Sequence, residues 1–177
     1  MNGDEQSGTA PSREGAGESR PWLSSASSEW PTPRTFYDLL DDDFHFTLDP
    51  CATPENAKAA RYFTREDDGL RQPWSGSVFM NPPYRDIRKW MAKAYRERRR
   101  CSVIVCLIPP RTDTKYWHSF VMHAAELRFV QGRIRFEGGA NCAPFPSVVV
   151  VFTRRSDGPP RVTSMYRDAL ARDRASS

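Results

Sequence analysis

The segment Asn81-Pro82-Pro83-Tyr84 places two carbonyl acceptors and an aromatic ring within four residues. The side-chain carbonyl of Asn81 and the main-chain carbonyl of Pro82 can each accept a hydrogen bond from an amino group on which positive charge develops. Pro82 and Pro83 restrict the backbone and so fix the direction of these carbonyls. Tyr84 offers a ring face on which a planar group can stack. The four residues are candidates for catalysis at an amine, with an ordinary turn as the alternative, because Asn and Pro also favour turns.

A carboxylate stands at a comparable place earlier in the chain. Segment 44–49 alternates between apolar and polar residues, which is the period of a strand, and it ends in Asp49. Asn81 follows the short apolar segment 78–80, which also predicts a strand. Because open parallel sheets bind ligands at the carboxyl ends of their strands, we expect Asp49 and Asn81 to face one crevice. The alternative for Asp49 is a helix cap or a surface acid.

The segments around these residues alternate between helix and strand patterns. Apolar residues recur through segment 87–95 at the spacing of one helix face, and segment 103–108 is a continuous apolar run, as in a strand buried on both sides. Other patterns predict helices at 54–61 and 116–122 and strands at 127–130, 133–136 and 147–152. This order predicts an α/β fold with a mostly parallel sheet and an antiparallel edge at its C-terminal end.

The chain has 177 residues, which suffices for one domain with a buried core. Residues 1–28 are rich in Gly, Ser, Glu and Ala and carry few large apolar groups, so we expect a disordered leader. Residues 29–154 are the expected folded domain. After Arg154 the composition turns polar, and we expect residues 155–177 to be a polar tail that can hold a short helix at 166–171.

The composition gives the chain a basic character and argues against some classes of protein. A net charge of +4 and a pI near 9.0 fit nucleic-acid binding, and a basic solvated surface explains them equally well. The four cysteines lack a two-residue spacing and the three histidines are scattered, so we expect no metal site. No apolar run approaches the about 20 residues that span a bilayer, and no secretory signal is visible, so we expect a soluble cytoplasmic protein.

Several segments together resemble one known family. Besides Asn81-Pro82-Pro83-Tyr84, they are Glu29-Trp30-x-Thr32-Pro33, Leu48-Asp49-x-Cys51-Ala52-x-x-x-Asn56-Ala57, Gly132-Arg133 and Ala143-Pro144-Phe145-Pro146. Residues 29–153 thereby resemble the phage-type, Dam-like family of DNA N-6-adenine methyltransferases, and Asn-Pro-Pro-Tyr resembles the fourth motif of amino-group methyltransferases that act on adenine. The resemblance implies a compact Rossmann-like methyltransferase sheet that uses S-adenosylmethionine and no metal.

The resemblance also implies roles for individual residues. It implies base capture by residues 81–84, after a target adenine has been flipped out of double-stranded DNA. The implied cofactor-binding residues are Trp30, Thr32, Pro33, Asp49 and Pro50, with Asp67 or Asp68 at the ribose hydroxyls. The expected DNA contacts are Arg85, Arg111, Arg133 and Arg135. Thr32 and Pro33 can also simply begin the first helix, and Asp67 and Asp68 can be ordinary loop acids.

The loop after Asp49 departs from the family pattern. Related methyltransferases carry closely spaced glycines there, whereas this chain has Asp49-Pro50-Cys51-Ala52-Thr53-Pro54. Only 32 positions lead from Asp49 to Asn81, so the strands between them must be shortened or missing. A nucleic-acid-binding relative without activity is therefore one alternative. Methylation of another amine, such as the amino group of cytosine, adenine in RNA or a glutamine amide, is the other, because each needs two acceptors beside a methyl donor.

Overall fold

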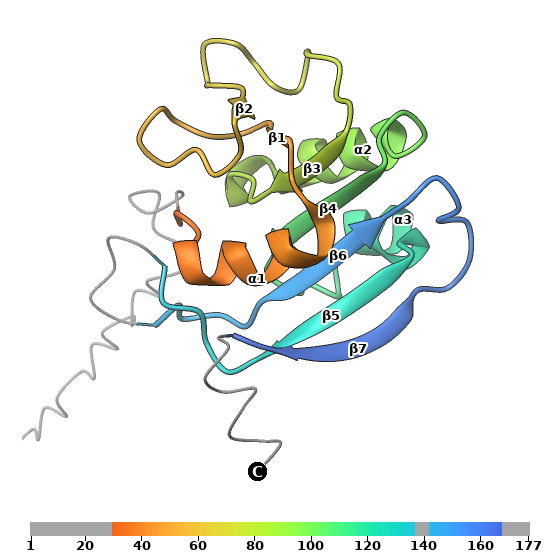
Figure 1. Ribbon diagram of the computed structural model, residues 1–177. Helices are drawn as coiled ribbons and strands as arrows, with labels where there is room; N and C mark the ends of the chain where they lie inside the picture. The colour runs from red at the N-terminus through yellow and green to blue at the C-terminus, as the bar shows by residue number, and fades with distance from the viewer. Residues whose placement is uncertain (1–29, 137–141, 168–177) are drawn as a thin grey trace, which may run out of the picture.

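The computed structural model describes residues 30–136 and 142–167, which form a seven-stranded sheet with helices packed on it (Figure 1). The helices are α1 (Arg34–Phe44), α2 (Ile87–Glu97) and α3 (Lys115–Ser119), with the short 3-10 helices η3 (Tyr84–Asp86) and η4 (Val121–His123). The strands are β1 (Leu48–Asp49), β2 (Arg61–Tyr62), β3 (Ser77–Met80), β4 (Val103–Ile108), β5 (Glu126–Gln131), β6 (Val148–Phe152) and β7 (Arg161–Tyr166). The expected leader, residues 1–28, lies outside the described residues.

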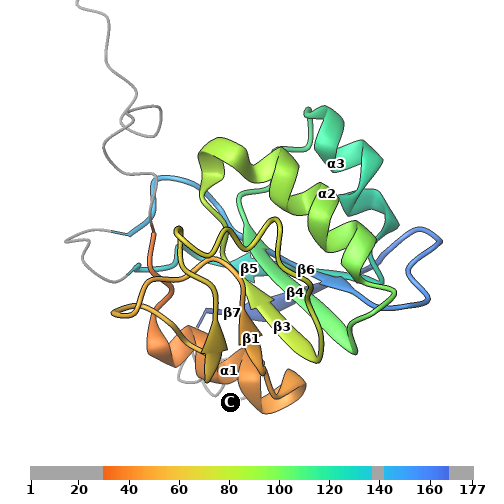
Figure 2. The ribbon, with the colours of Figure 1, turned by 90° about the horizontal axis from the view of Figure 1, so that it is seen from above.

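The helices lie in two layers, one on each face of the sheet. Figure 2 shows α1 on one side and α2 and α3 on the other. Side chains alternate along the central strand β4, so Ile104 and Cys106 join the core under α2 and α3, whereas Val105 and Leu107 join the core under α1. Both cores are made of buried apolar side chains, which explains why the sequence of this strand is an unbroken apolar run.

The sheet has the order β2-β1-β3-β4-β6-β5-β7 and is mostly parallel. Among the strands of the described residues, only β6 runs against its neighbours, because it pairs antiparallel with both β4 and β5. The prediction of an antiparallel C-terminal edge is therefore wrong in its position, since the reversed strand is internal and the edge strand β7 pairs parallel with β5. The result is a mixed α/β sheet that is compatible with a Rossmann-like fold.

Strand β7 lies in the segment for which the sequence predicted a polar tail. Its side chains are mostly exposed or half-buried, so the segment lacks the apolar pattern that marks an inner strand. It is held by parallel backbone pairing with β5 along all six of its residues, and Arg161 and Thr163 add hydrogen bonds of 2.8 and 3.0 Å to the Glu126 carboxylate on β5. The helix predicted at 166–171 begins inside this strand at Tyr166, and its residues from 168 on lie outside the described ranges.

The strand predicted at 44–49 is shorter than its alternating pattern suggests. Phe44 is the last residue of α1, and His45 adopts a left-handed conformation with φ of +50°, which ends the helix. The apolar pattern arises because Phe46 packs under α1 together with Phe79, although Phe46 lies outside the sheet ladder. Strand β1 is thus limited to Leu48 and Asp49.

Two other predicted elements are loops. The segment predicted as a helix at 54–61 forms turns, because the Thr53 carbonyl accepts the Asn56 and Ala57 amide hydrogens, at 3.2 and 2.9 Å, and the helical hydrogen bonding does not continue beyond this first turn. The strand predicted at 133–136 is irregular, since Gly132 has a φ of +83° that turns the chain away after β5. The alternation there reflects Ile134 and Phe136, which are buried under the α1 face.

The elements that frame the predicted catalytic residues agree with the sequence. The segments predicted around 78–80, 87–95 and 103–108 are β3, α2 and β4, and helix 116–122 corresponds to α3 and η4. Strand β3 lies between β1 and β4 and pairs parallel with both, so the carboxyl ends of the three strands lie at the same edge of the sheet. Within the described ranges, no helix combines the length and apolar character needed to cross a membrane.

Candidate functional site

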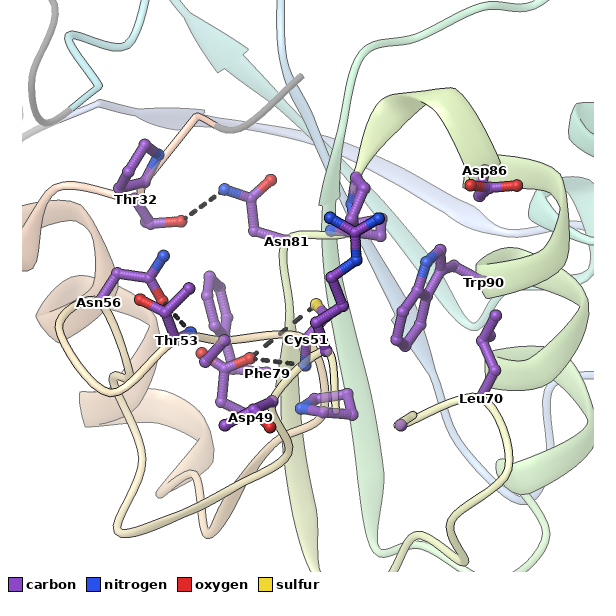
Figure 3. A pocket seen from close by; sticks show the side chains of 18 of the residues that line it. Thr32, Asp49, Cys51, Thr53, Asn56, Leu70, Phe79, Asn81, Asp86 and Trp90 are labelled. Carbon is purple, nitrogen blue, oxygen red and sulfur yellow. Dashed lines mark hydrogen bonds between the residues drawn. The ribbon is translucent and has the colours of Figure 1, made fainter. Parts of the chain in front are cut away.

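A cavity of about 440 Å³ opens at the edge where β1 and β3 end (Figure 3). Its size falls within the range of small-molecule sites. Asp49 ends β1 and Asn81 directly follows β3, and both side chains line this cavity, as expected for polar residues at the ends of parallel strands. The other predicted residues on its wall are Trp30, Thr32, Pro50, Asp68, Pro82, Pro83 and Arg85.

The Asn81 side chain is held in one orientation by the segment that precedes α1. Its amide nitrogen donates hydrogen bonds to the Trp30 carbonyl oxygen at 2.6 Å and to the Thr32 hydroxyl at 2.9 Å. Figure 3 shows the Asn81 nitrogen directed at Thr32 and the oxygen directed away from it. The oxygen has the Tyr84 hydroxyl as a neighbour at 3.4 Å. Both hydrogens of the amide nitrogen are therefore used within the protein, and the amide oxygen is left as the acceptor that a ligand can meet.

Tyr84 lies beside Asn81 in a group of aromatic rings. Its ring meets Phe145 edge-on at a centroid distance of 5.4 Å, and Phe145 meets Trp30 edge-on at 5.3 Å. Burial raises the pKa of the Tyr84 hydroxyl, and the nearby positive charge of Arg111 opposes that rise. Arg111 follows β4 and is exposed, and its positive charge influences the ionisation of the Tyr84 hydroxyl.

Asp49 is a buried carboxyl group at the floor of the cavity. Its oxygen accepts a hydrogen bond of 3.3 Å from the Cys51 amide. Burial raises the pKa of Asp49 to about 6, and hydrogen bonds from the Cys51 and Lys58 backbone and the Lys58 charge limit the rise. A buried carboxylate gains most from a positively charged partner. Asp49 is therefore suited to bind a cationic group of a ligand.

The two candidate ribose-binding acids lie differently. Asp68 lines the cavity, where its backbone has a φ of +51° and its carboxylate accepts the Leu70 amide hydrogen at 3.3 Å. Asp67 is exposed and accepts hydrogen bonds from both the amide and the hydroxyl of Thr64, at 2.8 and 2.9 Å. Asp67 thereby closes a local turn, and Asp68 is the acid that can reach a ligand in the cavity.

The loop that carries Asp68 packs directly against the loop after β1. A Cβ atom on Gly69 would overlap the Pro50 carbonyl oxygen, and it would also come within 3.3 Å of the Trp90 ring. The Gly69 carbonyl accepts a hydrogen bond of 2.8 Å from the Trp74 indole. Only glycine allows this approach of the two loops, so Gly69 shapes the cavity wall.

The remaining predicted residues lie outside the cavity wall. Pro33 is the N-cap residue of α1, in agreement with the alternative that it simply begins the first helix. Arg133 and Arg135 are exposed in the loop after β5, and the Arg133 carbonyl accepts a hydrogen bond from Arg167 at 3.2 Å. Across the part of the chain that the structure describes, no group of three or more His, Cys, Asp or Glu residues could hold a metal ion.

Several lining residues have no role in the sequence prediction. They are Pro31, Cys51, Ala52, Thr53, Asn56, Lys58, Thr64, Arg65, Gly69, Leu70, Phe79, Asp86, Lys89 and Trp90. Trp90 belongs to the apolar stripe of α2, which the sequence marks only as core, yet its ring also faces the cavity. Asn56 and Ala52 stand in one of the family-like segments, which was the available signal for them. Acidic and basic side chains both border this cavity.

Comparisons with known proteins point to one family. A model of the DNA N-6-adenine-methyltransferase (Dam) family matches residues 22–175. A DNA N-6-adenine-methyltransferase of Escherichia phage T1 is 26% identical over 105 residues, which cover 58% of this chain and 44% of the phage protein. The putative methyltransferase YfdM of Escherichia coli strain K12 is 36% identical over 70 residues, which cover 35% of this chain and 77% of that protein.

The extent of these matches differs. The chain matches less than half of the length of the phage T1 protein and about three quarters of YfdM. The family model, in contrast, matches nearly the whole chain, including the segment that forms the cavity and the strands on both sides of it. The chain therefore belongs to the DNA N-6-adenine-methyltransferase (Dam) family.

Proposed function

We propose that this protein transfers a methyl group from S-adenosylmethionine to the exocyclic amine of an adenine that is flipped out of double-stranded DNA. The observation that carries the proposal is the Asn81 amide, whose nitrogen is held by Trp30 and Thr32 so that its oxygen is presented in the cavity that also holds Asp49. Membership of the family supports the reaction class and the target base. The mostly parallel sheet supports a Rossmann-like methyltransferase fold.

The cavity has features that fit the cofactor. Its volume of about 440 Å³ suits a ligand of this size. Asp49 would hold the ammonium group of the methionine part, Asp68 would hold the ribose hydroxyls, and Trp90 and Leu70 offer apolar surface for the adenine ring. When bound there, S-adenosylmethionine supplies a methyl group that is activated by a positively charged sulfur.

The accepting amine needs help because its lone pair is delocalised into the adenine ring. Asn81 Oδ1 and the Pro82 carbonyl would accept the two amine hydrogens, which favours the pyramidal nitrogen and stabilises the positive charge that develops on it. Transfer would form the bond from the amine nitrogen to the methyl carbon and break the bond from that carbon to sulfur, leaving S-adenosylhomocysteine, while the amine releases one proton to water. Both acceptors belong to a loop that directly follows a fully buried strand, so they are positioned before the base arrives.

The surface around Tyr84 suits a flipped base and its strand. Flipping costs a few kcal/mol of stacking, and an aromatic ring such as that of Tyr84 can restore about 1–3 kcal/mol. Arg85 is exposed at the cavity rim and Arg111 lies near Tyr84, so both would contact phosphates. Arg133 and Arg135 would extend this contact, and the net charge of +4 favours it. Such a protein would act in the cytoplasm of a bacterial or phage-infected cell.

The test is to incubate unmethylated double-stranded DNA with the purified protein and S-adenosylmethionine, and then to identify the methylated nucleosides by mass spectrometry. We expect 6-methyladenine to form with time and enzyme concentration. Asn81→Ala, purified from the same host, is the control for contaminating methyltransferases, and it should form 6-methyladenine about 10²- to 10³-fold more slowly. Sequencing of the product at single-molecule resolution would then locate the modified positions.

The same experiment distinguishes the alternatives. A product of 4-methylcytosine would show that the protein methylates the amino group of cytosine. Methylation of RNA but not of DNA would show that RNA is the substrate. If calorimetric titration with S-adenosylmethionine gives no heat and no protection against unfolding, the protein is a binding module and the proposal is wrong. Formation of 6-methyladenine at equal rates by the wild type and Asn81→Ala would also contradict it.

A further inference from the structure

The orientation of the Asn81 amide decides whether the side chain helps or opposes an incoming amine. The terminal torsion of Asn is broad and roughly two-fold, so an unrestrained side chain would also present its NH₂ end. Two N–H groups aimed at an amine that carries its own two hydrogens would repel it. The proposed function therefore needs hydrogen bonds that hold the oxygen end of the Asn81 amide toward the base.

The residues before α1 provide such hydrogen bonds to the Asn81 amide. The Trp30 carbonyl can only accept a hydrogen bond, so the group that meets it at 2.6 Å must be the amide nitrogen of Asn81. The Thr32 hydroxyl lies 2.9 Å from the same nitrogen and uses its second hydrogen. A reversed amide would place oxygen against the Trp30 carbonyl, with two acceptors facing each other.

The segment that provides these two oxygens is itself fixed. Thr32 is only 3% exposed. The Trp30 ring is held edge-on by Phe136 at 5.6 Å and by Phe145 at 5.3 Å. The Pro33 carbonyl accepts the first hydrogen bonds of α1, from the Phe36 and Tyr37 amides, so the segment continues into a helix packed on the sheet. The two acceptors therefore come from a rigid part of the molecule.

We propose that Thr32 is a positioning residue that acts on the methyl-accepting amine through Asn81, together with the main-chain carbonyl of Trp30. This assignment differs from the cofactor-binding role that the family resemblance implies for Thr32. It rests on the proposed function for its effect on rate. The orientation of the Asn81 amide, in contrast, is a property of the protein alone and can be measured without substrate.

The variants that test this are Thr32→Val, which keeps the shape and removes the hydroxyl, and Thr32→Ser, which keeps the hydroxyl. Thr35→Val is the matched control, because it makes the same chemical change at an exposed position of α1 outside the cavity. At saturating cofactor and DNA, the single-turnover rate of Thr32→Val should fall about 10- to 100-fold, since small misplacements of reacting groups cost up to this much. Thr32→Ser should retain most of the rate, and Thr35→Val should match the wild type.

Cofactor affinity separates positioning from cofactor binding. We expect calorimetry to give Thr32→Val an S-adenosylmethionine Kd within about threefold of the wild-type value, because the hydroxyl acts on Asn81 rather than on the ligand. A Kd weakened tenfold or more, with an unchanged saturated rate, would assign Thr32 to the cofactor and overturn the proposal. If valine prevents folding, Thr32→Ala against Thr32→Ser gives the same comparison.

An NMR measurement tests the orientation of the Asn81 amide even if the wild type transfers no methyl group. The chain has only four asparagines, so ¹⁵N-asparagine labelling gives few side-chain amide signals, and Asn81→Ala assigns the relevant pair. In the wild type both Asn81 amide hydrogens should be protected from exchange with solvent. Thr32→Val should change the shift and speed the exchange of one of them. Unchanged signals in Thr32→Val would contradict the proposal independently of any activity.

Discussion

The two halves of the cavity are built in different ways. The accepting half comprises Trp30, Thr32 and residues 81–83 on the cavity wall, with Tyr84 and Phe145 beside them, and its catalytic loop follows the buried four-residue strand β3. Its central contacts run from Asn81 to Thr32 and to Trp30, which lie 49 and 51 positions away in the chain. The donor half, residues 49–70, is carried by two strands of two residues each and by turns. Its hydrogen bonds are mostly local, such as those within Thr53 to Asn56 and Thr64 to Asp67.

This difference has a physical consequence. Catalytic acceptors must be held to a fraction of an ångström, and a sheet strand with long-range hydrogen bonds achieves this better than a turn. A cofactor with many contact points tolerates a loop-built site, because no single contact decides its orientation. We therefore expect changes in the donor half to affect cofactor binding, and changes in the accepting half to affect the rate of transfer.

The largest effect in the donor half is expected from Gly69→Ala. The added methyl group overlaps the Pro50 carbonyl, so the two loops must separate, at a cost of about 1–3 kcal/mol in unfolding free energy. S-adenosylmethionine affinity should fall at least about tenfold, as measured by calorimetry. Gly158→Ala is the control, because nothing lies within 4 Å of its added atom. Equal stability and affinity in both variants would show that the approach of the loops does not shape the site.

In the accepting half, Tyr84→Ala should lower the rate of transfer and spare cofactor affinity. Loss of the stacking face is worth about 1–3 kcal/mol for a flipped base, which corresponds to roughly a 5- to 150-fold loss in kcat/KM for DNA. Tyr84→Phe keeps the ring and loses only a 3.4 Å contact to Asn81, so it should stay within about threefold of wild type. If Phe is as damaging as Ala, the hydroxyl and not the ring is what the site needs.

A smaller effect in the donor half comes from the titration of Asp49. Because its pKa is about 6 and the charged form would bind the cofactor ammonium, affinity for S-adenosylmethionine should rise about tenfold between pH 5 and pH 7. Asp49→Asn should bind weakly and without this pH dependence. Calorimetry at several pH values would check both expectations, and an equally steep pH dependence in Asp49→Asn would assign the titration to another group.

The same carboxyl group also affects the stability of the free protein. Burial raises its folded-state pKa from the ordinary value of 3.8 to about 6, so the folded state binds the proton more tightly than the unfolded state does. Its contribution to stability is therefore lost as the pH rises from about 4 to about 6. Thermal unfolding of the wild type minus that of Asp49→Asn should show this decline. A difference that grows with pH in this window would contradict the assigned pKa.

The sequence predicts the accepting half better than the donor half for a physical reason. Strands β3 and β4 and helix α2 are covered by core on at least one full face, so burial imposes a periodic apolar pattern on them. The rule that polar residues gather at the ends of parallel strands then suffices to bring Asp49 and Asn81 into one crevice. The segment 54–61, in contrast, holds a single turn made by local hydrogen bonds among Thr53, Asn56 and Ala57, and such local bonding leaves no periodic trace.

Long-range polar contacts are equally hidden in the sequence. Nothing in the residue pattern indicates that the Asn81 amide meets Thr32, because hydrogen bonding between distant loops leaves no periodicity. The sequence does not predict the edge strand β7 for a similar reason, since backbone pairing with β5 and the Glu126 contacts hold it while its side chains are exposed or half-buried. Trp90 shows the opposite case, in which a residue on an apolar helix stripe also borders the ligand cavity.

The most direct test of the two-part site is the single-turnover rate of Asn81→Ala at saturating S-adenosylmethionine, measured as 6-methyladenine formed in DNA, with the cofactor Kd determined on the same preparation. Removing one preorganised group that stabilises developing charge should lower the rate by about 10²- to 10³-fold. The Kd should stay near the wild-type value, because the donor half is intact. A wild-type rate, or a rate loss explained entirely by weaker cofactor binding, would contradict the account.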